Sequence, residues 1–247
     1  MLEGRTYQDG RELSREEFYR RLPRLSSPPT TAAPSPASFE DVYRKLFERG
    51  FKRILSIHIS SKLSGMINAA AQAAQQFGDR VHIFDSGQAS VGLGFQVIEA
   101  GRAAARGLSL EDVREHARRT RERVQVIALI DTLEYLRRSG RVSWLRAGIG
   151  DLLKIKLLVR LRDGVVEPLS RIRTRQRALE SLAEMAAQWS PIERLAILHA
   201  NAAEDARALA HRLGSFCAEL PWTIDVTTII GVHVGPGAVG LAALPGP

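Results

Sequence analysis

The chain has 247 residues, of which 45% are hydrophobic and 25% charged, so its composition is that of a globular protein with a sizeable core. This length suits two compact lobes better than one. A single cysteine, Cys217, excludes an internal disulfide framework, and no apolar run approaches the roughly 18 residues of a membrane span. The N-terminus is charged from Glu3 onwards, unlike a secretory signal, and we therefore expect a cytoplasmic protein.

The net charge of +8 raises the alternative of a basic nucleic-acid-binding module. Of the 35 basic residues five are lysines, which leaves thirty arginines spread through most of the chain. Many stand beside glutamates on helical stretches, as in residues 111–124. This distribution favours solvated helix faces, with a local basic patch for an acidic protein partner, over a nucleic-acid interface.

The first half of the chain alternates between predicted strands and helices. A short strand or turn at residues 6–10 precedes a helix with Ser14 as its N-cap and Glu17 at the capping-box position. A proline-rich loop follows at residues 26–38. Helices are expected at 39–50, 61–78, 89–107 and 109–124, and strands at 52–60, 80–86 and 124–131. This alternation predicts an α/β lobe with a parallel sheet that includes the apolar strand at 124–131.

The pattern changes after about residue 150. Residues 152–174 are typical of a hairpin around an Asp163-Gly164 turn. Helices are then expected at 175–189 and 202–214, and strands at 194–200 and 223–234. We therefore predict an α/β protein with domains at residues 1–150 and 151–247, the second an α+β lobe.

Near the C-terminus, the stretch GVHVGPGAVG (residues 231–240) formally matches a dinucleotide-binding fingerprint through Gly235, Gly237 and Gly240. That fingerprint needs a following helix and an acidic residue about 20 positions later. Only seven residues follow Gly240, and none is acidic. The glycines therefore indicate a tight turn after His233, at the end of the expected last strand.

A second polar stretch, ISSKLSGM (residues 59–66), joins an expected strand to an expected helix. A helix N-terminus exposes unpaired N–H groups that suit an anion, and Ser64 with Gly65 would lie in its first turn. The alternative is that Ser60 or Ser61 merely caps the helix.

Motifs of other enzyme classes are absent from the sequence. It has no Walker A loop, no H-E-x-x-H and no G-x-S-x-G, and its six histidines and one cysteine show no metal-ligand spacing. We therefore expect no metal, no cofactor and no catalytic residue. The alternative, Ser64 as a nucleophile activated by His233 in an acyl hydrolase or transferase, lacks an identifiable acid to orient the histidine.

Seven stretches occur in the order seen in the DegV family of fatty-acid-binding proteins, and the chain resembles that family over essentially its whole length from Thr6. They are TTAAPSPASFEDVY, ILSIHISSKLSGMINAA, VHIFDSGQASVGLG, DTLEYLRRSGRVS, LLKIKLLVRLRDG, RIRTRQRALE and IGVHVGPGAVG. The resemblance implies a two-lobe fold with a long-chain fatty acid between the lobes. It also implies a separate fatty acid kinase as partner, which converts the bound fatty acid into an acyl phosphate for phospholipid metabolism. Beyond the absent membrane span, transient membrane contact is compatible with this role.

Carried over by position, the resemblance implies that Thr31, Ser64, the Gly65 N–H and His233 hold the fatty-acid carboxylate. It further implies that a basic sequence containing Arg171, Arg173 and Arg175 docks the kinase. The alternative is that these three arginines are solvated side chains without a partner. Strand alternation would place these three arginines on one side.

The chain departs from the family pattern in several places. The usual first strand, with an Asp-Ser pair, and the early helix are expected to be missing. The usual Thr-Ser-Gln-Pro loop reads Thr31-Ala32-Ala33-Pro34, which removes one hydroxyl and one amide. Met66 and Leu157 replace a usual threonine and a usual proline.

Overall fold

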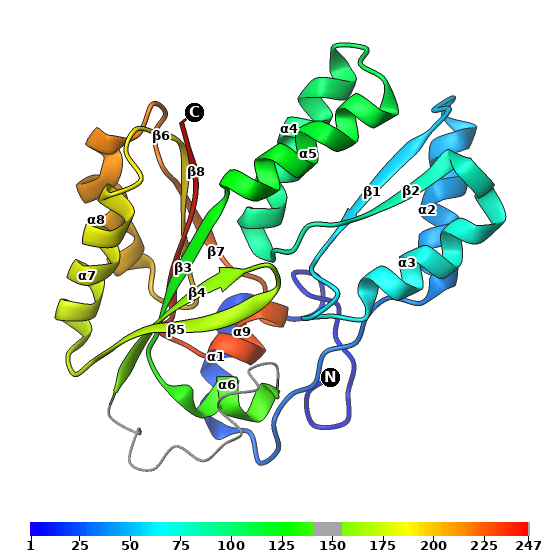
Figure 1. The fold of residues 1–247 in the computed structure, drawn as a ribbon. Helices are drawn as coiled ribbons and strands as arrows, with labels where there is room; N and C mark the ends of the chain where they lie inside the picture. Colours follow the sequence, from blue (N-terminus) through cyan, green and yellow to red (C-terminus); the bar gives the residue numbers. More distant parts are fainter. Residues whose placement is uncertain (141–154, 247) are drawn as a thin grey trace. The chain divides into compact units, whose positions relative to one another are not determined.

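The computed structural model describes residues 1–140 and 155–246, and its elements are labelled in Figure 1. The chain divides into two compact units. The mixed-sheet unit comprises Met1–Ala32, Gln125–Leu161 and Val166–Pro247, and the parallel-sheet unit comprises Ala33–Val124 with Arg162–Val165. The domain boundary expected at residue 150 lies outside the described residues.

The mixed-sheet unit is built on six strands in the order β5-β4-β3-β8-β6-β7. Their bounds are β3 Gln125–Ile130, β4 Lys156–Arg162, β5 Val165–Ile172, β6 Ile192–His199, β7 Trp222–Asp225 and β8 Val239–Pro245. β3 is antiparallel to both β4 and β8, whereas β6 and β7 are parallel. The expectation that β3 belongs to the parallel sheet was therefore wrong. Its continuous apolar run fits any strand covered on both faces and does not reveal the partner strand.

The hairpin prediction is confirmed, because β4 and β5 are neighbours joined at Asp163 and Gly164. Both turn residues have positive φ, +47° and +73°, as a two-residue hairpin turn with matched strand twist requires.

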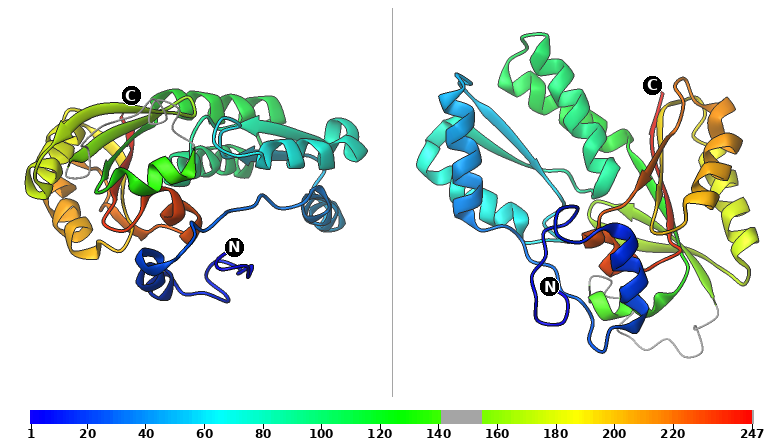
Figure 2. Two further views of the ribbon diagram at one scale, coloured as in Figure 1. Left: turned by 90° about the horizontal axis from the view of Figure 1, so that it is seen from below. Right: turned by 180° about the vertical axis from the view of Figure 1, so that it is seen from behind.

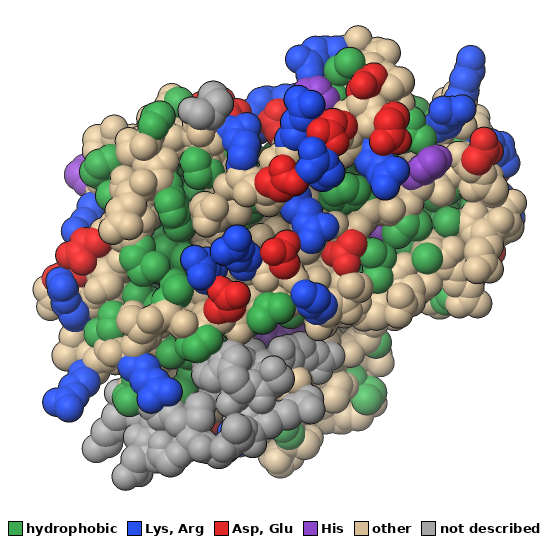
Figure 3. Space-filling view, in the orientation of Figure 1, with side chains coloured by type: hydrophobic (Ala, Val, Ile, Leu, Met, Phe, Trp, Pro, Cys, Tyr) green, Lys and Arg blue, Asp and Glu red, His purple; other side chains and the backbone are tan. Residues whose placement is uncertain are grey.

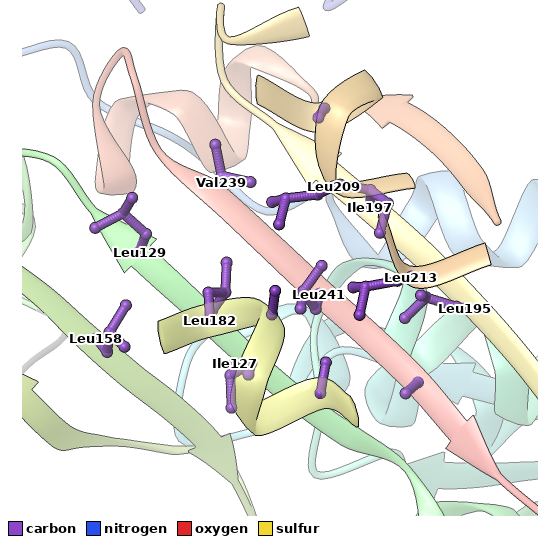
Figure 4. Close-up of a cluster of buried hydrophobic side chains, with 14 of the residues drawn as sticks. Ile127, Leu129, Leu158, Leu182, Leu195, Ile197, Leu209, Leu213, Val239 and Leu241 are labelled. Carbon is purple, nitrogen blue, oxygen red and sulfur yellow. The ribbon is translucent and has the colours of Figure 1, made fainter. Parts of the chain in front are cut away.

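Helices α7 (Arg175–Ala187) and α8 (Ala203–Leu213) pack on this sheet and form the main core with it. Figure 4 shows Leu182 of α7 and Leu209 of α8 among side chains of the sheet. Two of these sheet residues, Leu129 and Leu241, are fully buried. The remaining helices of the unit are α1 Arg15–Arg21, η1 Leu22–Arg24, α6 Leu133–Ser139, η5 Gly214–Phe216 and α9 Thr228–Val234.

The C-terminal stretch differs most from expectation. Residues 223–234 were predicted as one strand, but β7 ends at Asp225 and α9 begins at Thr228. Thr227 is the N-cap of α9, and its hydroxyl accepts a hydrogen bond from the Ile230 N–H at 3.4 Å. This cap and tertiary packing override the β propensity of the threonine, isoleucine and valine residues. The structure also contains β8, a strand that the sequence analysis did not predict.

The parallel-sheet unit has two strands, β1 (Ile54–His58) and β2 (Val81–Asp85), which pair in parallel as predicted. Its helices are α2 Pro36–Glu48, α3 Met66–Ala74, η2 Gln75–Arg80, α4 Ser90–Ala105 and α5 Leu110–Arg123. Leu55 and Ile57 of β1 pack with α4 and α5, whereas Ile54 packs with α2 and α3. This alternation is the period of two that a strand covered on both faces requires.

Charged side chains on α5 are mostly paired within the helix. Arg118 forms ion pairs with Glu115 and Glu122, and Arg119 pairs with Glu115. Figure 3 shows basic and acidic side chains interspersed over α4 and α5. None of the helices in the described part of the chain is long and apolar enough to span a membrane.

Candidate functional site

A pocket of about 260 Å³ lies within the mixed-sheet unit and contains two of the predicted ligands, Thr31 and His233. Its apolar lining residues are Leu22, Leu25, Pro28, Pro29, Tyr135 and Val232. Its polar lining residues are Ser27, Thr30, Thr31, Arg138, Ser139 and His233. The pocket therefore combines hydroxyl, imidazole and guanidinium groups with apolar surface.

His233 reaches the pocket from α9 and not from a strand as predicted. Helix α1 packs against α9 at Gly231, where an added Cβ would lie 2.6 Å from the Tyr19 hydroxyl and 2.9 Å from Phe18 Cε1 (Figure 2). Phe18 and Tyr19 are buried, and burial raises the pKa of the Tyr19 hydroxyl above its ordinary value. A glycine two residues before His233 thus permits the close approach that fixes α9.

The turn after α9 depends on a second glycine. Gly235 has φ +74° and ψ 171°, a conformation that is essentially restricted to glycine. An added Cβ there would lie 2.2 Å from Tyr135 Cδ2. The tight turn expected after His233 is therefore present, and it lets the backbone approach an aromatic ring that lines the pocket.

Thr31 is half-buried in the extended loop that follows η1. The preceding residue, Thr30, forms two backbone hydrogen bonds with Met1. The Met1 nitrogen donates to the Thr30 carbonyl at 2.6 Å, and the Thr30 N–H donates to the Met1 carbonyl at 3.1 Å. The loop is therefore tied to a second segment immediately before the predicted ligand.

Helix α6 provides a wall of the pocket that was not predicted from the sequence. Thr132 caps this helix, and its hydroxyl accepts the Glu134 N–H at 3.4 Å. α6 contributes Tyr135, Arg138 and Ser139 to the pocket, with Arg138 held by Glu134 at 2.7 Å. The only sequence signal for these residues was the TLEYLRRSG motif.

The other two predicted ligands, Ser64 and Gly65, belong to the parallel-sheet unit. They stand immediately before α3, whose N-cap is Gly65, and not in its first turn as predicted. The Ser64 hydroxyl accepts a hydrogen bond from the Met66 N–H at 3.2 Å, so its own proton can still be donated to an acceptor. The backbone at Gly65 is unobstructed, because a Cβ added to this residue would meet no atom within 4 Å.

The neighbouring serines bind groups other than the start of α3. Ser61 donates its hydroxyl to Asp85 Oδ2 at 2.7 Å, and Ser60 accepts the Lys62 N–H at 3.3 Å. Burial alone would raise the pKa of Asp85, but hydrogen bonds from the Gly87 N–H and from Ser61 hold it below its ordinary value. Asp85 is thus a structural anion that fixes the loop before Ser64.

His58 lies in a polar network inside the same unit. Its Nε2 is 2.7 Å from the Ser56 hydroxyl, which is 2.8 Å from the Tyr43 hydroxyl. The imidazole is 8% exposed, and burial lowers its pKa. His58 is therefore a buried histidine with a hydroxyl partner.

The three arginines of the predicted docking patch differ in their surroundings. Arg171 lies in β5 and Arg173 follows that strand, and both are exposed. Arg175 opens α7 and forms ion pairs with Asp131 at 2.7 Å and Asp205 at 2.6 Å. Burial alone would lower the pKa of Arg175, but its hydrogen bonds to the two carboxylates raise it. Arg175 therefore does not continue the strand, and the predicted placement of all three arginines on one side of a strand was wrong.

Among the described residues, no group of three or more His, Cys, Asp or Glu side chains is placed to hold a metal ion.

Comparison with known proteins gives a consistent picture. The DegV family, described as uncharacterised proteins, matches residues 1–246. A DegV domain-containing protein of Deinococcus radiodurans is 34% identical over 249 residues, which cover 99% of this chain and 88% of that protein.

Two solved structures are similar over nearly the whole chain. A DegV family protein from Thermus thermophilus, described by its fatty acid binding, is 34% identical with a TM-score of 0.90. The match covers 99% of this chain and 89% of that chain. DegV from Bacillus subtilis, described as a fatty acid binding protein, is 29% identical with a TM-score of 0.84. The match covers 100% of this chain and 89% of that chain. The α/β fold expected from the resemblance matches the fold of these structures.

Proposed function

This chain belongs to the DegV family, and we propose that it binds a long-chain fatty acid by its carboxylate without catalysing a reaction on it. The observation that carries the proposal is the pocket in which Thr31 and His233 lie together beside apolar side chains. The fatty acid binding described for the Thermus thermophilus and Bacillus subtilis relatives supports it.

The chemistry of the pocket matches a fatty-acid head group. A carboxylate has two acceptor oxygens, and the Thr31 hydroxyl and a ring N–H of His233 can each donate to one of them. Arg138 also lines the wall, with its charge paired to Glu134 at 2.7 Å. The volume of about 260 Å³ is just below the roughly 300 Å³ of small ligand pockets, so it suits the head group and the first carbons. The rest of the tail needs apolar surface elsewhere, at about 0.8 kcal/mol per buried CH₂.

We propose carboxylate binding for Ser64 and Gly65 as well. They offer a hydroxyl and an unobstructed backbone N–H before the N-terminus of α3, where the helix dipole favours an anion. Together with Thr31 and His233 they are the positions that the family resemblance selects. All of these groups are neutral donors, so they can bind a carboxylate without requiring a buried counter-charge.

A further part of the proposal is a fatty acid kinase as partner, which would phosphorylate the bound carboxylate. Arg171 and Arg173 are exposed at the end of β5 and provide a local positive patch for an acidic surface of this kinase. We assign docking to these two arginines, because the guanidinium of Arg175 is already bound to two carboxylates.

The test is the affinity for oleate, measured by calorimetry, of the wild type and of His233→Ala and Ser64→Ala. Each variant removes a hydrogen bond to a charged group, worth about 1.5–3 kcal/mol, so we expect affinity to fall about 10- to 150-fold. His211→Ala and Ser215→Ala serve as matched controls on exposed positions. Unchanged oleate affinity in both site variants, with circular dichroism and melting preserved, would refute the carboxylate assignment.

A further inference from the structure

Arg175 does not line the pocket, but its guanidinium binds Asp131, Asp205 and the Gly237 carbonyl. We propose that Arg175 is a positioning residue. It holds α6 and α9, two walls of the pocket that contains Thr31 and His233, in a fixed position relative to one another. This inference rests on the proposed function, because it assigns a role toward the same pocket. All the residues involved lie within the mixed-sheet unit.

The guanidinium of Arg175 joins three segments that are distant in the sequence. Its Nη1 donates to Asp131 Oδ1 at 2.7 Å and to the Gly237 carbonyl at 2.8 Å. Its Nε and Nη2 both donate to Asp205 Oδ2, at 3.1 Å and 2.6 Å. The side chain is 30% exposed, so these bonds are only partly screened by water.

Two of these three segments lead directly to the pocket. Asp131 precedes Thr132, the N-cap of α6, and this helix brings Tyr135, Arg138 and Ser139 to the pocket. Gly237 lies in the turn that ends α9, four residues after His233. One guanidinium therefore fixes the start of one wall and the end of the other.

The backbone at Gly237 is shaped for this contact. Its φ is +81°, and an added Cβ would lie 3.2 Å from Asp131 Cβ and 3.4 Å from Arg175 Nη1. The Gly237 N–H donates to the Ala200 carbonyl at 2.7 Å, so the peptide is held from the other side too. A glycine is needed because the chain passes so close to the ion pair in a left-handed conformation.

The charges at this junction balance. Lys156 Nζ lies 2.9 Å from Asp131 Oδ1, so Asp131 and Asp205 face two cations, Lys156 and Arg175. Removing Arg175 would leave Asp131 with Lys156 and would take the Arg175 donor away from Asp205 and from the Gly237 carbonyl. A lysine would keep the charge, but it lacks the planar fork that binds two carboxylates and a carbonyl together.

The experiment compares Arg175→Ala and Arg175→Lys with Arg177→Ala, an exposed control on the same helix that pairs with Glu180 and Glu184. Two quantities are measured: oleate affinity, and the NMR resonances of the His233 ring in ligand-free protein. We expect Arg175→Ala to weaken oleate binding about tenfold and to shift the His233 resonances. Arg175→Lys should give smaller changes of the same kind, and Arg177→Ala none. Arg175→Lys carries the test if Arg175→Ala does not fold.

A purely stabilising role is separated by Leu213→Ala, which truncates a core residue that does not line the pocket. The inference predicts that Leu213→Ala lowers the melting temperature but keeps wild-type oleate affinity and His233 resonances. Wild-type affinity and unshifted His233 resonances in both Arg175 variants would overturn it, as would an equal loss of affinity in Leu213→Ala. If the wild type binds no oleate, the proposed function is refuted. The His233 resonances of the variants would still test whether Arg175 positions α6 and α9.

Discussion

Replacing Gly235 by alanine tests how the turn after His233 couples stability to the pocket. The conformation of Gly235, φ +74° and ψ 171°, costs a non-glycine residue about 1–3 kcal/mol. The new Cβ would also meet Tyr135 Cδ2 at 2.2 Å, and overpacking of this kind costs about 1–3 kcal/mol. We therefore expect Gly235→Ala to lower the free energy of unfolding by about 2–6 kcal/mol.

The assay is denaturant unfolding of Gly235→Ala beside Gly214→Ala, a matched control. Gly214 has φ −57°, and an added Cβ there would meet nothing within 4 Å, so we expect little change. Because Tyr135 lines the pocket, its displacement should also weaken oleate binding in Gly235→Ala. If Gly235→Ala matches Gly214→Ala in both stability and affinity, the reasoning about this turn is refuted.

Two further predictions concern the partner and the pH dependence. Arg173→Glu should lower acyl-phosphate formation by a cognate fatty acid kinase and leave oleate affinity unchanged; equal kinase activity at low salt would remove Arg173 from the interface. Burial lowers the folded-state pKa of His58 below its unfolded value of 6.5. The unfolded chain therefore binds more protons as the pH falls below about 6.5, and the free energy of unfolding should decrease there. This decrease should be smaller in His58→Gln. If the urea midpoint of unfolding falls equally in the wild type and in His58→Gln between pH 7.5 and 5.5, the assignment is contradicted.

Local signals in the sequence predicted much of the fold. The Asp163-Gly164 pair specifies a hairpin turn by its backbone preference, and Ser14 caps its helix by a short-range hydrogen bond. The family resemblance also placed Thr31 and His233, which the structure brings to one pocket. These features depend on few neighbouring residues, or on motifs whose order is specific.

The errors concern tertiary partners. The residues of β3 show that the strand is buried but not that it pairs with β4 and β8. The strand β8 is a continuous apolar run without the alternation of a half-buried strand. Arg175 was read as surface charge because its partners, Asp131 and Asp205, are 44 and 30 residues away in the sequence. Such contacts leave no local pattern.

The central claim is that this protein holds a fatty acid, and the most direct test is its lipid content after native purification. Mass spectrometry of the extracted lipids should find a long-chain fatty acid at about one per protein chain in the wild type. His233→Ala, purified in parallel, should retain much less, because a donor to the carboxylate has been removed. Wild-type protein without bound fatty acid, and unable to take up added oleate, would contradict the account.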